Sequence, residues 1–217
     1  MFTRVLLQAS DFQLSQLDSS PPERSRSVRY GILLGCGLVV SSAVYVLSSF
    51  IAPAFRRVCL PYVPATPAQL DKVTRLLTIA RQEKRLQSLG SVIDLGSGDG
   101  RVLLHLLTHP EVSFTRGFGV ELNRPLVWYS RWNAYRSLGP KRKMISFCCG
   151  DMWKTNLTDY QTVVVFGVDS MMERLEDKLL RELKPGSLVV TCRFPLPKLY
   201  PEHSLVAGPD SVYIYYL

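Results

Sequence analysis

Residues 92–101 read VIDLGSGDGR, and this stretch decides the fold of the chain. It begins with an apolar strand pattern, which runs directly into glycines at three alternate positions. An apolar run over residues 102–107 follows at once and predicts a helix. A strand, a glycine turn and a helix N-terminus together present backbone N–H groups to a ligand. The alternative is an ordinary strand–turn–helix corner that binds nothing.

The spacing of the glycines separates two classes of nucleotide-binding turn. Dinucleotide-binding folds use G-x-G-x-x-G, whose third glycine allows the helix to pack closely on the strand. Here the order is G-x-G-x-G, and Arg101 stands at the position of that third glycine. Asp94, near the end of the strand, repels a pyrophosphate but suits a ligand with an ammonium group. We therefore expect S-adenosylmethionine rather than a nicotinamide cofactor, and the lack of G-K-[ST] disfavours ATP.

The composition narrows the class of protein. The 217 residues leave room for one globular domain and a smaller segment beside it. The net charge of +8 suits an anionic lipid or a nucleic acid as partner. Five cysteines without C-x-x-C spacing indicate neither a disulfide framework nor a zinc site. His105 and His109 have i, i+4 spacing, but no third ligand accompanies them, and we expect no metal site.

The N-terminal part contains a long uncharged segment. Residues 31–52 carry no charged side chain, and as a helix they would span about 33 Å, against about 30 Å for the hydrocarbon core of a bilayer. We expect one transmembrane or membrane-embedded helix here, because a buried helix of a soluble protein would show a polar face. Residues 1–30 are expected to form a flexible leader, and residues 53–65 a proline-rich linker. Arginines flank both ends of the helix, so its orientation stays open.

Beyond residue 66, strand and helix patterns alternate, which is typical of an α/β fold. The sequences at residues 66–69 and 170–173 both have the pattern of a capping box. Strand patterns cover residues 92–95, 116–122, 144–149, 162–168, 187–193, 204–207 and 211–216, and helix patterns cover residues 70–80, 102–107, 125–138 and 170–183. We predict a doubly wound, Rossmann-like sheet of seven strands, parallel with an antiparallel end. The last two strands follow the fifth without room for a helix, so that edge is expected to be abbreviated.

Acidic residues stand at the carboxyl ends of three predicted strands, where ligands bind in open α/β sheets. Asp94 belongs to the first strand, Glu121 to the second, and Asp151 follows the third. Glu121 stands where an acid binds both ribose hydroxyls of a nucleoside. Asp151 can accept a hydrogen bond from the adenine amino group, with Met152 and Trp153 beside the ring. The sequence therefore predicts a nucleoside site at this edge.

Two further features bear on the substrate. The fourth strand ends in VFGV at residues 165–168, which lacks the [ND]-P-P-[YF] motif of many amide and adenine-N6 methyltransferases. Methylation of bases or glutamine is therefore disfavoured. The helix over residues 125–138 is rich in aromatic residues, which we expect mostly to pack on the sheet, with one or two open to a substrate entrance: Trp128, Tyr129, Trp132 and Tyr135.

Several stretches resemble the membrane-anchored mitochondrial lysine methyltransferases of the seven-β-strand class. Between its two branches, the chain is more similar, at residues 166–168 and 171–172, to the branch that acts on the ATP synthase c-subunit than to the one that acts on the adenine nucleotide translocase. It departs from the family by an inserted Arg124 and by Met152 in place of leucine. The stretches that carry the resemblance are LPYVPAT (60–66), DLGSGDGR (94–101), VELN (120–123), LVWYSR (126–131), DMWK (151–154) and CRFPLP (192–197).

The resemblance implies a methyltransferase domain over residues 66–217 that uses S-adenosylmethionine. The expected cofactor-binding residues are Asp94, Gly96, Ser97, Gly98, Asp99, Gly100, Glu121, Leu122, Asn123, Asp151 and Met152. The expected substrate-side residues are Trp153, Phe166, Arg193 and Phe194, and no residue stands out as a general base.

The implied reaction is methylation of a lysine in a protein of the mitochondrial inner membrane, foremost the ATP synthase c-subunit, by an enzyme anchored in that membrane through residues 31–52. One alternative is methylation of the adenine nucleotide translocase. Another is a membrane-tethered methyltransferase acting on a lipid or quinone-like small molecule. A binding module without activity and a nucleic-acid methyltransferase are disfavoured, the first by the three acids and the second by the membrane helix.

Overall fold

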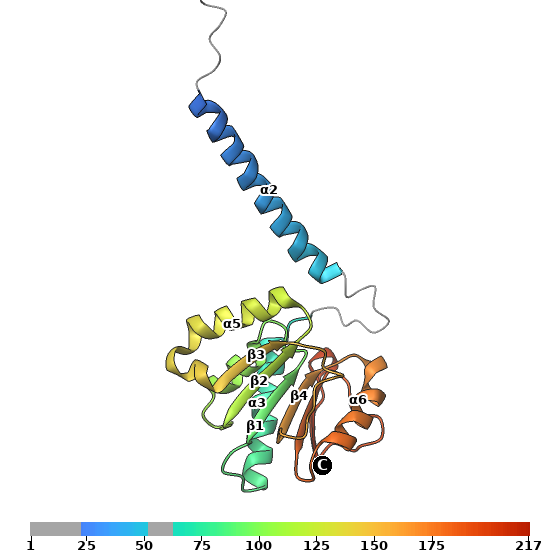
Figure 1. The fold of residues 1–217 in the computed structure, drawn as a ribbon. Helices are drawn as coiled ribbons and strands as arrows, with labels where there is room; N and C mark the ends of the chain where they lie inside the picture. The colour runs from blue at the N-terminus through green and yellow to red at the C-terminus, as the bar shows by residue number, and fades with distance from the viewer. Residues whose placement is uncertain (1–22, 52–62) are drawn as a thin grey trace, which may run out of the picture. The chain divides into compact units, whose positions relative to one another are not determined.

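The computed structural model describes residues 23–51 and 63–217. The chain divides into two compact units, and the first, which ends at Ser48, contains all but the last residues of the long helix α2 (Glu23–Ile51) (Figure 1). Most of the predicted leader (1–30) and of the predicted linker (53–65) lies outside the described residues. Helix α2 begins earlier than the uncharged segment and includes three arginines. By length and composition, residues Ser27–Ser48 form a helix that could cross a bilayer, and their side chains are exposed.

The second unit is built on one sheet of seven strands, in the order β3-β2-β1-β4-β5-β7-β6. The five strands from β3 to β5 are parallel, whereas β7 runs antiparallel to β5 and β6 antiparallel to β7. The predicted seven-stranded α/β sheet with an antiparallel end is confirmed. The strands are β1 (Ser91–Leu95), β2 (Arg116–Glu121), β3 (Ile145–Cys149), β4 (Thr162–Phe166), β5 (Leu188–Cys192), β6 (His203–Leu205) and β7 (Val212–Tyr216).

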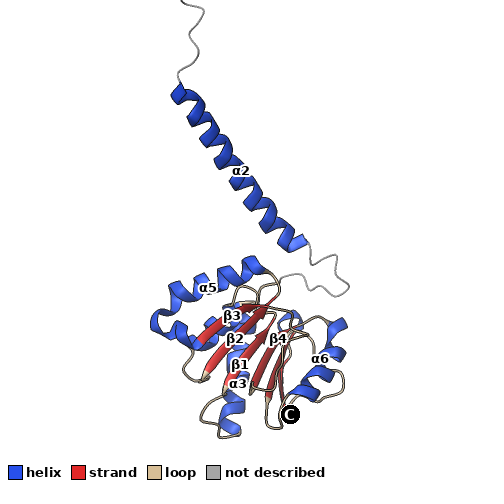
Figure 2. Ribbon diagram, in the orientation of Figure 1, coloured by secondary structure: helices blue, strands red, loops and turns tan. Residues whose placement is uncertain are grey.

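Helices flank the sheet (Figure 2). They are α3 (Pro67–Glu83), α4 (Arg101–Thr108), α5 (Arg124–Leu138) and α6 (Asp169–Glu182), with short 3₁₀ helices η2 (Gly139–Met144) and η3 (Gly208–Asp210). Because successive strand residues point to opposite faces, the core divides into two clusters. Val164 packs in the first with side chains from α3, α4 and α5, and its neighbour Val165 packs in the second with side chains from α6.

The second face of the sheet has two loops where helices are absent. Within residues 63–217, no helix lies between β3 and β4 or between β5 and β6. Apolar side chains of these loops instead pack on the second core cluster: Met152, Trp153, Leu157, Tyr160, Phe194, Leu196 and Leu199. The abbreviated edge that the sequence predicted is thus confirmed, and the loops that replace the missing helices form part of the core.

The two predicted capping boxes have different outcomes. At α3, Gln69 N donates to Thr66 Oγ1 (3.1 Å) and Thr66 N donates to Gln69 Oε1 (2.9 Å), so the first box is confirmed. The second is wrong, because α6 begins at Asp169, with Val168 as its N-cap and no capping side chain. Met171 and Met172 are both buried in the core and lie in the first turn of the helix, so packing determines where α6 begins.

The orientation expected for α5 is also wrong. Its aromatic side chains were expected mostly to pack on the sheet, but Trp128 is 57% exposed and Tyr135 is 64% exposed. The residues that α5 buries are small or aliphatic and recur about every four positions: Leu126, Val127, Ser130, Ala134 and Leu138. At 100° per residue the aromatic side chains therefore lie on the opposite side of the helix.

A buried carboxylate holds the loop between β5 and β6. Glu176 on α6 is fully buried and accepts hydrogen bonds from Lys198 N (3.0 Å) and Leu199 N (2.7 Å). We predict that Glu176→Ala lowers the Tm of the detergent-solubilised chain by about 6–24 °C, because each of the two bonds to a charged acceptor contributes about 1.5–3 kcal/mol. Glu173→Ala, at a side chain 75% exposed on the same helix, is the control and should change Tm little. Equal shifts in the two variants would contradict this role.

Candidate functional site

The site is built around the turn between β1 and α4. Gly96, Gly98 and Gly100 all have positive φ, at 83°, 52° and 81°, which other residues adopt only with strain. Gly96 N and Ser97 N donate to Val120 O, so the turn bends over the end of β2. A Cβ at Gly100 would lie 2.7 Å from the ring of Phe147. All three glycines are therefore required by backbone conformation, and Gly100 is required by close packing as well.

Asp94 lies in β1 beneath this turn and is completely buried. Neither of its carboxylate oxygens has a hydrogen-bond partner among the described residues, and the same holds for Ser97 Oγ. Burial raises the pKa of Asp94 to about 8, and the nearby charges of Glu121 and Asp99 contribute to this rise. An unpartnered buried acceptor is costly, and a cationic donor is the group that would satisfy it. The site thus fits a ligand with an ammonium group.

Glu121, at the end of β2, connects two parts of the site. Its Oε2 accepts a hydrogen bond from Gly98 N (3.0 Å) and its Oε1 accepts one from Asn123 N (2.7 Å). The Glu121 side chain is therefore hydrogen-bonded both to the glycine turn and to Asn123, the residue at the start of α5. A carboxylate has about four acceptor positions, so two remain for ligand hydroxyls. The structure brings Asp94, Glu121 and the glycine turn together, as their sequence positions predicted.

Asp99 and Arg101 form a support for the turn that the sequence did not predict. Arg101 Nη2 lies 2.6 Å from Asp99 Oδ2, and its Nε donates to both carboxylate oxygens. Arg101 Nη1 also donates to Ala65 O (2.9 Å), just before α3. The residue that replaces the third glycine of a dinucleotide-binding turn therefore fastens the start of α3 to this turn. The sequence predicted Asp99 as a cofactor-binding residue. In the structure its carboxylate instead accepts hydrogen bonds from Arg101, so a contact with cofactor through this carboxylate stays a prediction.

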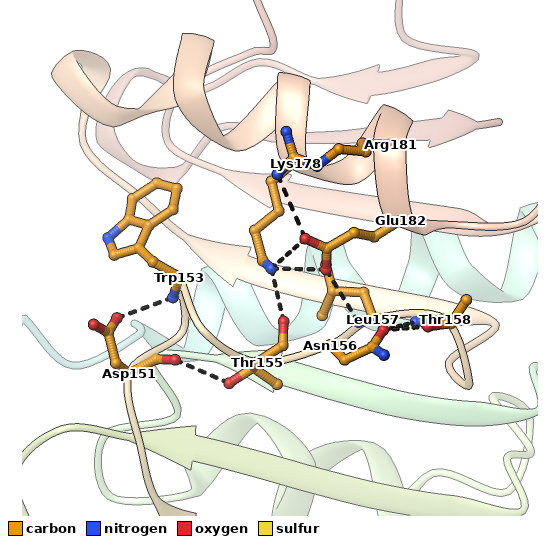
Figure 3. Close-up of polar contacts among 9 residues, drawn as sticks. All are labelled: Asp151, Trp153, Thr155, Asn156, Leu157, Thr158, Lys178, Arg181 and Glu182. Carbon is orange, nitrogen blue, oxygen red and sulfur yellow. Dashed lines mark hydrogen bonds and ion pairs between the residues drawn. The ribbon is translucent and has the colours of Figure 1, made fainter.

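Asp151 begins the loop that follows β3, and Figure 3 shows how this loop is held. Asp151 Oδ1 accepts from Trp153 N (3.0 Å), and Asp151 O accepts from Thr155 Oγ1 (3.0 Å). Thr155 O in turn accepts from Lys178 Nζ (2.7 Å) on α6. Asp151 is thus positioned by a loop that α6 anchors.

The anchor of this loop is an ion pair within α6. Lys178 Nζ lies 2.7 Å from Glu182 Oε2, and Leu157 N donates to the same oxygen (3.2 Å) (Figure 3). Burial raises the pKa of Glu182, but the hydrogen bonds and charge of Lys178 outweigh this and hold that pKa below its usual value. Lys178 is 4% exposed, and only its i, i+4 spacing from Glu182 could have indicated the pair in the sequence.

The predicted substrate-side residues lie on two faces of the sheet. Phe166 ends β4 and packs against the first core cluster, whereas Trp153 and Phe194 pack against the second. Phe166 pairs in register with Cys192, and Arg193 follows directly, exposed and with φ of 82°. The guanidinium of Arg174 lies 4.1 Å from the ring centre of Trp153. Phe166 and Arg193 therefore lie at the ends of neighbouring strands, with the other two residues across the sheet.

The sequence is similar to proteins of one family. The family model of the ANTKMT methyltransferase domain matches residues 94–203. The ATP synthase C-subunit lysine N-methyltransferase of Homo sapiens is 39% identical over 219 residues, covering 98% of this chain and 82% of that protein. The adenine nucleotide translocase lysine N-methyltransferase of Mus musculus is 36% identical over 201 residues, covering 88% and 80%.

A solved structure has a similar fold. It is an RNA methyltransferase from Salinibacter ruber in complex with S-adenosyl-L-homocysteine, with a TM-score of 0.60 and 26% sequence identity. The similarity covers 71% of this chain and 93% of that chain. S-adenosyl-L-homocysteine is S-adenosylmethionine without its transferable methyl group. It carries the same ammonium group, which is the chemistry that Asp94 fits.

The raised pKa of Asp94 predicts an unusual pH dependence of stability in the absence of ligand. Unfolded, the carboxyl has a pKa of about 3.9, so between about pH 4 and pH 8 only the folded state holds the proton. The free energy of unfolding then falls as the pH rises, by up to about 1.4 kcal/mol per unit, and levels off above about pH 8. We predict that Asp94→Asn raises Tm at pH 8 and flattens its pH dependence.

The measurement is thermal unfolding of the ligand-free chain from pH 5 to pH 9. Asp159→Asn, at an exposed carboxylate, is the control and should follow the parent chain. If Asp94→Asn and the parent lose stability in parallel as the pH rises, the buried carboxyl does not have a raised pKa.

Proposed function

The chain belongs to the family of S-adenosylmethionine-dependent protein-lysine N-methyltransferases with an ANTKMT methyltransferase domain, and from this premise we propose that its substrate is a lysine of the ATP synthase c-subunit. The observation that carries the site assignment is the buried carboxyl group of Asp94 beneath the glycine turn, near Glu121, for which the described part of the chain supplies no hydrogen-bond partner. The human relative, whose name gives the ATP synthase C-subunit as its substrate, supports this assignment with 39% identity over 98% of this chain. The relative that acts on the nucleotide translocase supports a lysine of a membrane protein more generally.

The cofactor is S-adenosylmethionine, and we assign its parts to residues by charge and hydrogen-bonding capacity. Asp94 accepts from the ammonium group, which removes the cost of leaving its buried oxygens unpartnered. Glu121, already oriented by Gly98 N and Asn123 N, accepts from the ribose hydroxyls. Asp151 accepts from the adenine amino group. The remaining proposed contacts come from the glycine turn, from the residues that follow Glu121, and from the loop after β3 beside the adenine ring. They are Gly96, Ser97, Gly98, Asp99, Gly100, Leu122, Asn123 and Met152.

The bound cofactor supplies a methyl group that its sulfonium charge has already activated. The protein must align the lysine amine with that methyl and must receive the amine in its neutral form. With a lysine pKa of about 10.4, loss of the proton at pH 7.4 costs about 4 kcal/mol. We assign the alignment to the strand ends that carry Phe166 and Arg193, with Trp153 and Phe194 supporting the adjoining loops. Exclusion of water by the surrounding side chains disfavours the charged ammonium form and so lowers the cost of deprotonation.

The remaining assignments concern location. We assign residues 31–52 to the hydrocarbon core of the mitochondrial inner membrane, flanked by a leader over residues 1–30 and a linker over residues 53–65, with the methyltransferase domain over residues 66–217. The length and composition of α2 support the membrane assignment. Confinement to the membrane raises the effective concentration of the enzyme near a membrane-embedded substrate.

Methyl transfer from labelled S-adenosylmethionine tests the substrate. We predict that the purified full chain labels the c-subunit in mitochondrial membranes where this protein is unmethylated, and that Glu121→Gln lowers cofactor affinity about tenfold to a hundredfold, since bonds to a charged acceptor contribute about 1.5–3 kcal/mol. Glu111→Gln, an exposed carboxylate outside the site, is the matched control and should label as the parent does.

The labelled species distinguishes the alternatives. Label on the nucleotide translocase alone would move the chain to the other branch of the family. Label only in the lipid extract would overturn the protein substrate. Equal labelling by Glu121→Gln and the parent chain at limiting cofactor would overturn the assigned ribose contact.

Asp94 also predicts the pH dependence of cofactor binding. Binding the ammonium group requires Asp94 in its carboxylate form, so below about pH 8 the Asp94 carboxyl must release its proton when the cofactor binds. In this range the affinity for the cofactor should increase about tenfold for each unit by which the pH is raised. Above about pH 8 the α-amino group of the cofactor loses its own proton and affinity should fall. Calorimetry at pH 7 in two buffers of different ionisation enthalpy should detect release of about one proton. Release of no proton would contradict a neutral Asp94 in the free enzyme.

A further inference from the structure

The surface of α5 and η2 combines exposed aromatic and basic side chains, and the cofactor site uses none of them. Trp128, Trp132 and Tyr135 are 57%, 50% and 64% exposed within a folded domain. We call this surface the basic-aromatic face, and it consists of Trp128, Tyr129, Trp132, Tyr135, Arg136, Lys141, Arg142 and Lys143, all exposed. Such a concentration of large amphipathic rings on one side of a helix is unusual for a surface that faces only water.

The charge of the chain is concentrated in the same segment. Residues 122–150 contain six lysines and arginines and no aspartate or glutamate, so they carry +6 of the net +8 of the whole chain. The two kinds of side chain are also in contact: Arg136 lies 4.5 Å from the ring centre of Trp132, and Arg142 lies 4.8 Å from that of Tyr135. The face therefore presents rings and positive charges side by side.

This combination matches the surface of a bilayer that contains anionic lipid. Trp and Tyr are enriched at the boundary between headgroups and hydrocarbon, where the ring meets apolar atoms and the polar tip meets water. Lysines and arginines beside them are attracted by anionic headgroups. A nucleic acid would also suit rings and charges. The bilayer is favoured because the same chain has a helix, Ser27–Ser48, that could cross one.

The chain length keeps the domain close to such a surface. Residues 52–62 separate Ile51 of α2 from the first described residue of the domain, Val63. At about 3.5 Å per residue they extend at most about 40 Å. Any bilayer that holds α2 is therefore within reach of the domain, at a high effective concentration.

We propose that the basic-aromatic face of α5 and η2 docks on an anionic bilayer surface, as a second membrane contact besides α2. The proposal rests on the proposed membrane location but not on the identity of the methyl acceptor. Helix α5 begins at Arg124, directly after Leu122 and Asn123 at the cofactor end of β2. The face extends from Trp128, one turn into α5, to Lys143, just before the amino end of β3, which lies opposite the cofactor end of the sheet. Docking through this face would place the β3 edge of the sheet along the headgroups, with the cofactor end of β2 at one end of the contact.

The tryptophans of the chain report this contact directly. The sequence has three, Trp128, Trp132 and Trp153, and two of them lie on the face, whereas α2 has none. The full chain is inserted into vesicles of phosphatidylcholine with brominated acyl chains, with or without about one third phosphatidylglycerol. We expect the bromine quenching of tryptophan fluorescence to increase about twofold or more with the anionic lipid, and to decrease again at high salt.

Two charge-reversal variants make the test specific. Lys141→Glu combined with Lys143→Glu should abolish the added quenching, because two positive charges of the face become negative. Arg75→Glu combined with Lys184→Glu gives the same change of net charge at exposed sites elsewhere, and should keep it. Unchanged Tm and cofactor affinity in both show that the fold is intact. Trp128→Phe combined with Trp132→Phe should remove the signal, which assigns it to α5 rather than to Trp153.

Four outcomes would overturn the proposal. Equal quenching in neutral and anionic vesicles, or equal loss in both charge-reversal variants, would exclude a specific contact with anionic lipid. Protection of the tryptophans from soluble acrylamide only after addition of inner-membrane proteins would indicate a protein partner. Protection that grows with the concentration of the chain itself would indicate a second copy. Because quenching requires no methyl transfer, the membrane contact can be confirmed even if the proposed substrate is wrong. The proposed substrate can likewise be confirmed even if the membrane contact is absent.

Discussion

The candidate site is organised around one unfavourable feature, the burial of the Asp94 carboxyl group without a hydrogen-bond partner among the described residues. Burial and the charges of Glu121 and Asp99 hold its pKa at about 8. The carboxyl group has an acceptor position that a bound cation can use, and the fold does not fill this position with a donor from the described residues. The surrounding parts resist relaxation: the glycine turn is bonded to Val120 O, and Arg101 fastens it to the residue before α3. A ligand ammonium group offsets a cost that the fold has already incurred, and this favours binding by preorganisation.

Helix α6 stabilises the site from the other face of the sheet through buried charges. Glu176 accepts from backbone N–H groups of the loop after β5, and Lys178 donates to the loop after β3. Each loop stands where a doubly wound fold usually has a helix, and each carries residues assigned to the site. Hydrogen bonds from α6 thus hold these two loops in the positions where two helices would otherwise pack on the sheet.

The sequence was sufficient for the parts of the fold that depend on periodicity and on glycine spacing. The strand–turn–helix unit, the seven strands and the capping box at Thr66 follow from local patterns, as does the grouping of Asp94 with Glu121. The parts that sequence reasoning missed depend on tertiary contacts. Whether α5 buries its aromatic residues or Val127 and Ala134 depends on the space above β2 and β3, and α6 begins where its methionines pack.

A methyl acceptor in a membrane imposes two separate demands on such an enzyme. It must remain near the bilayer, and it must turn the cofactor end of its sheet toward the acceptor. Attachment through a single membrane helix meets the first demand, since it limits the distance of a domain from the bilayer but does not fix its orientation. The second demand needs another contact, placed on a rigid element close to the cofactor. Helix α5 has both properties, because it begins at the residues that follow Glu121 and packs in the first core cluster through Val127, Ala134 and Leu138. A surface of aromatic rings and positive charges on this helix would fix the orientation of the domain relative to the bilayer, in addition to its distance from it.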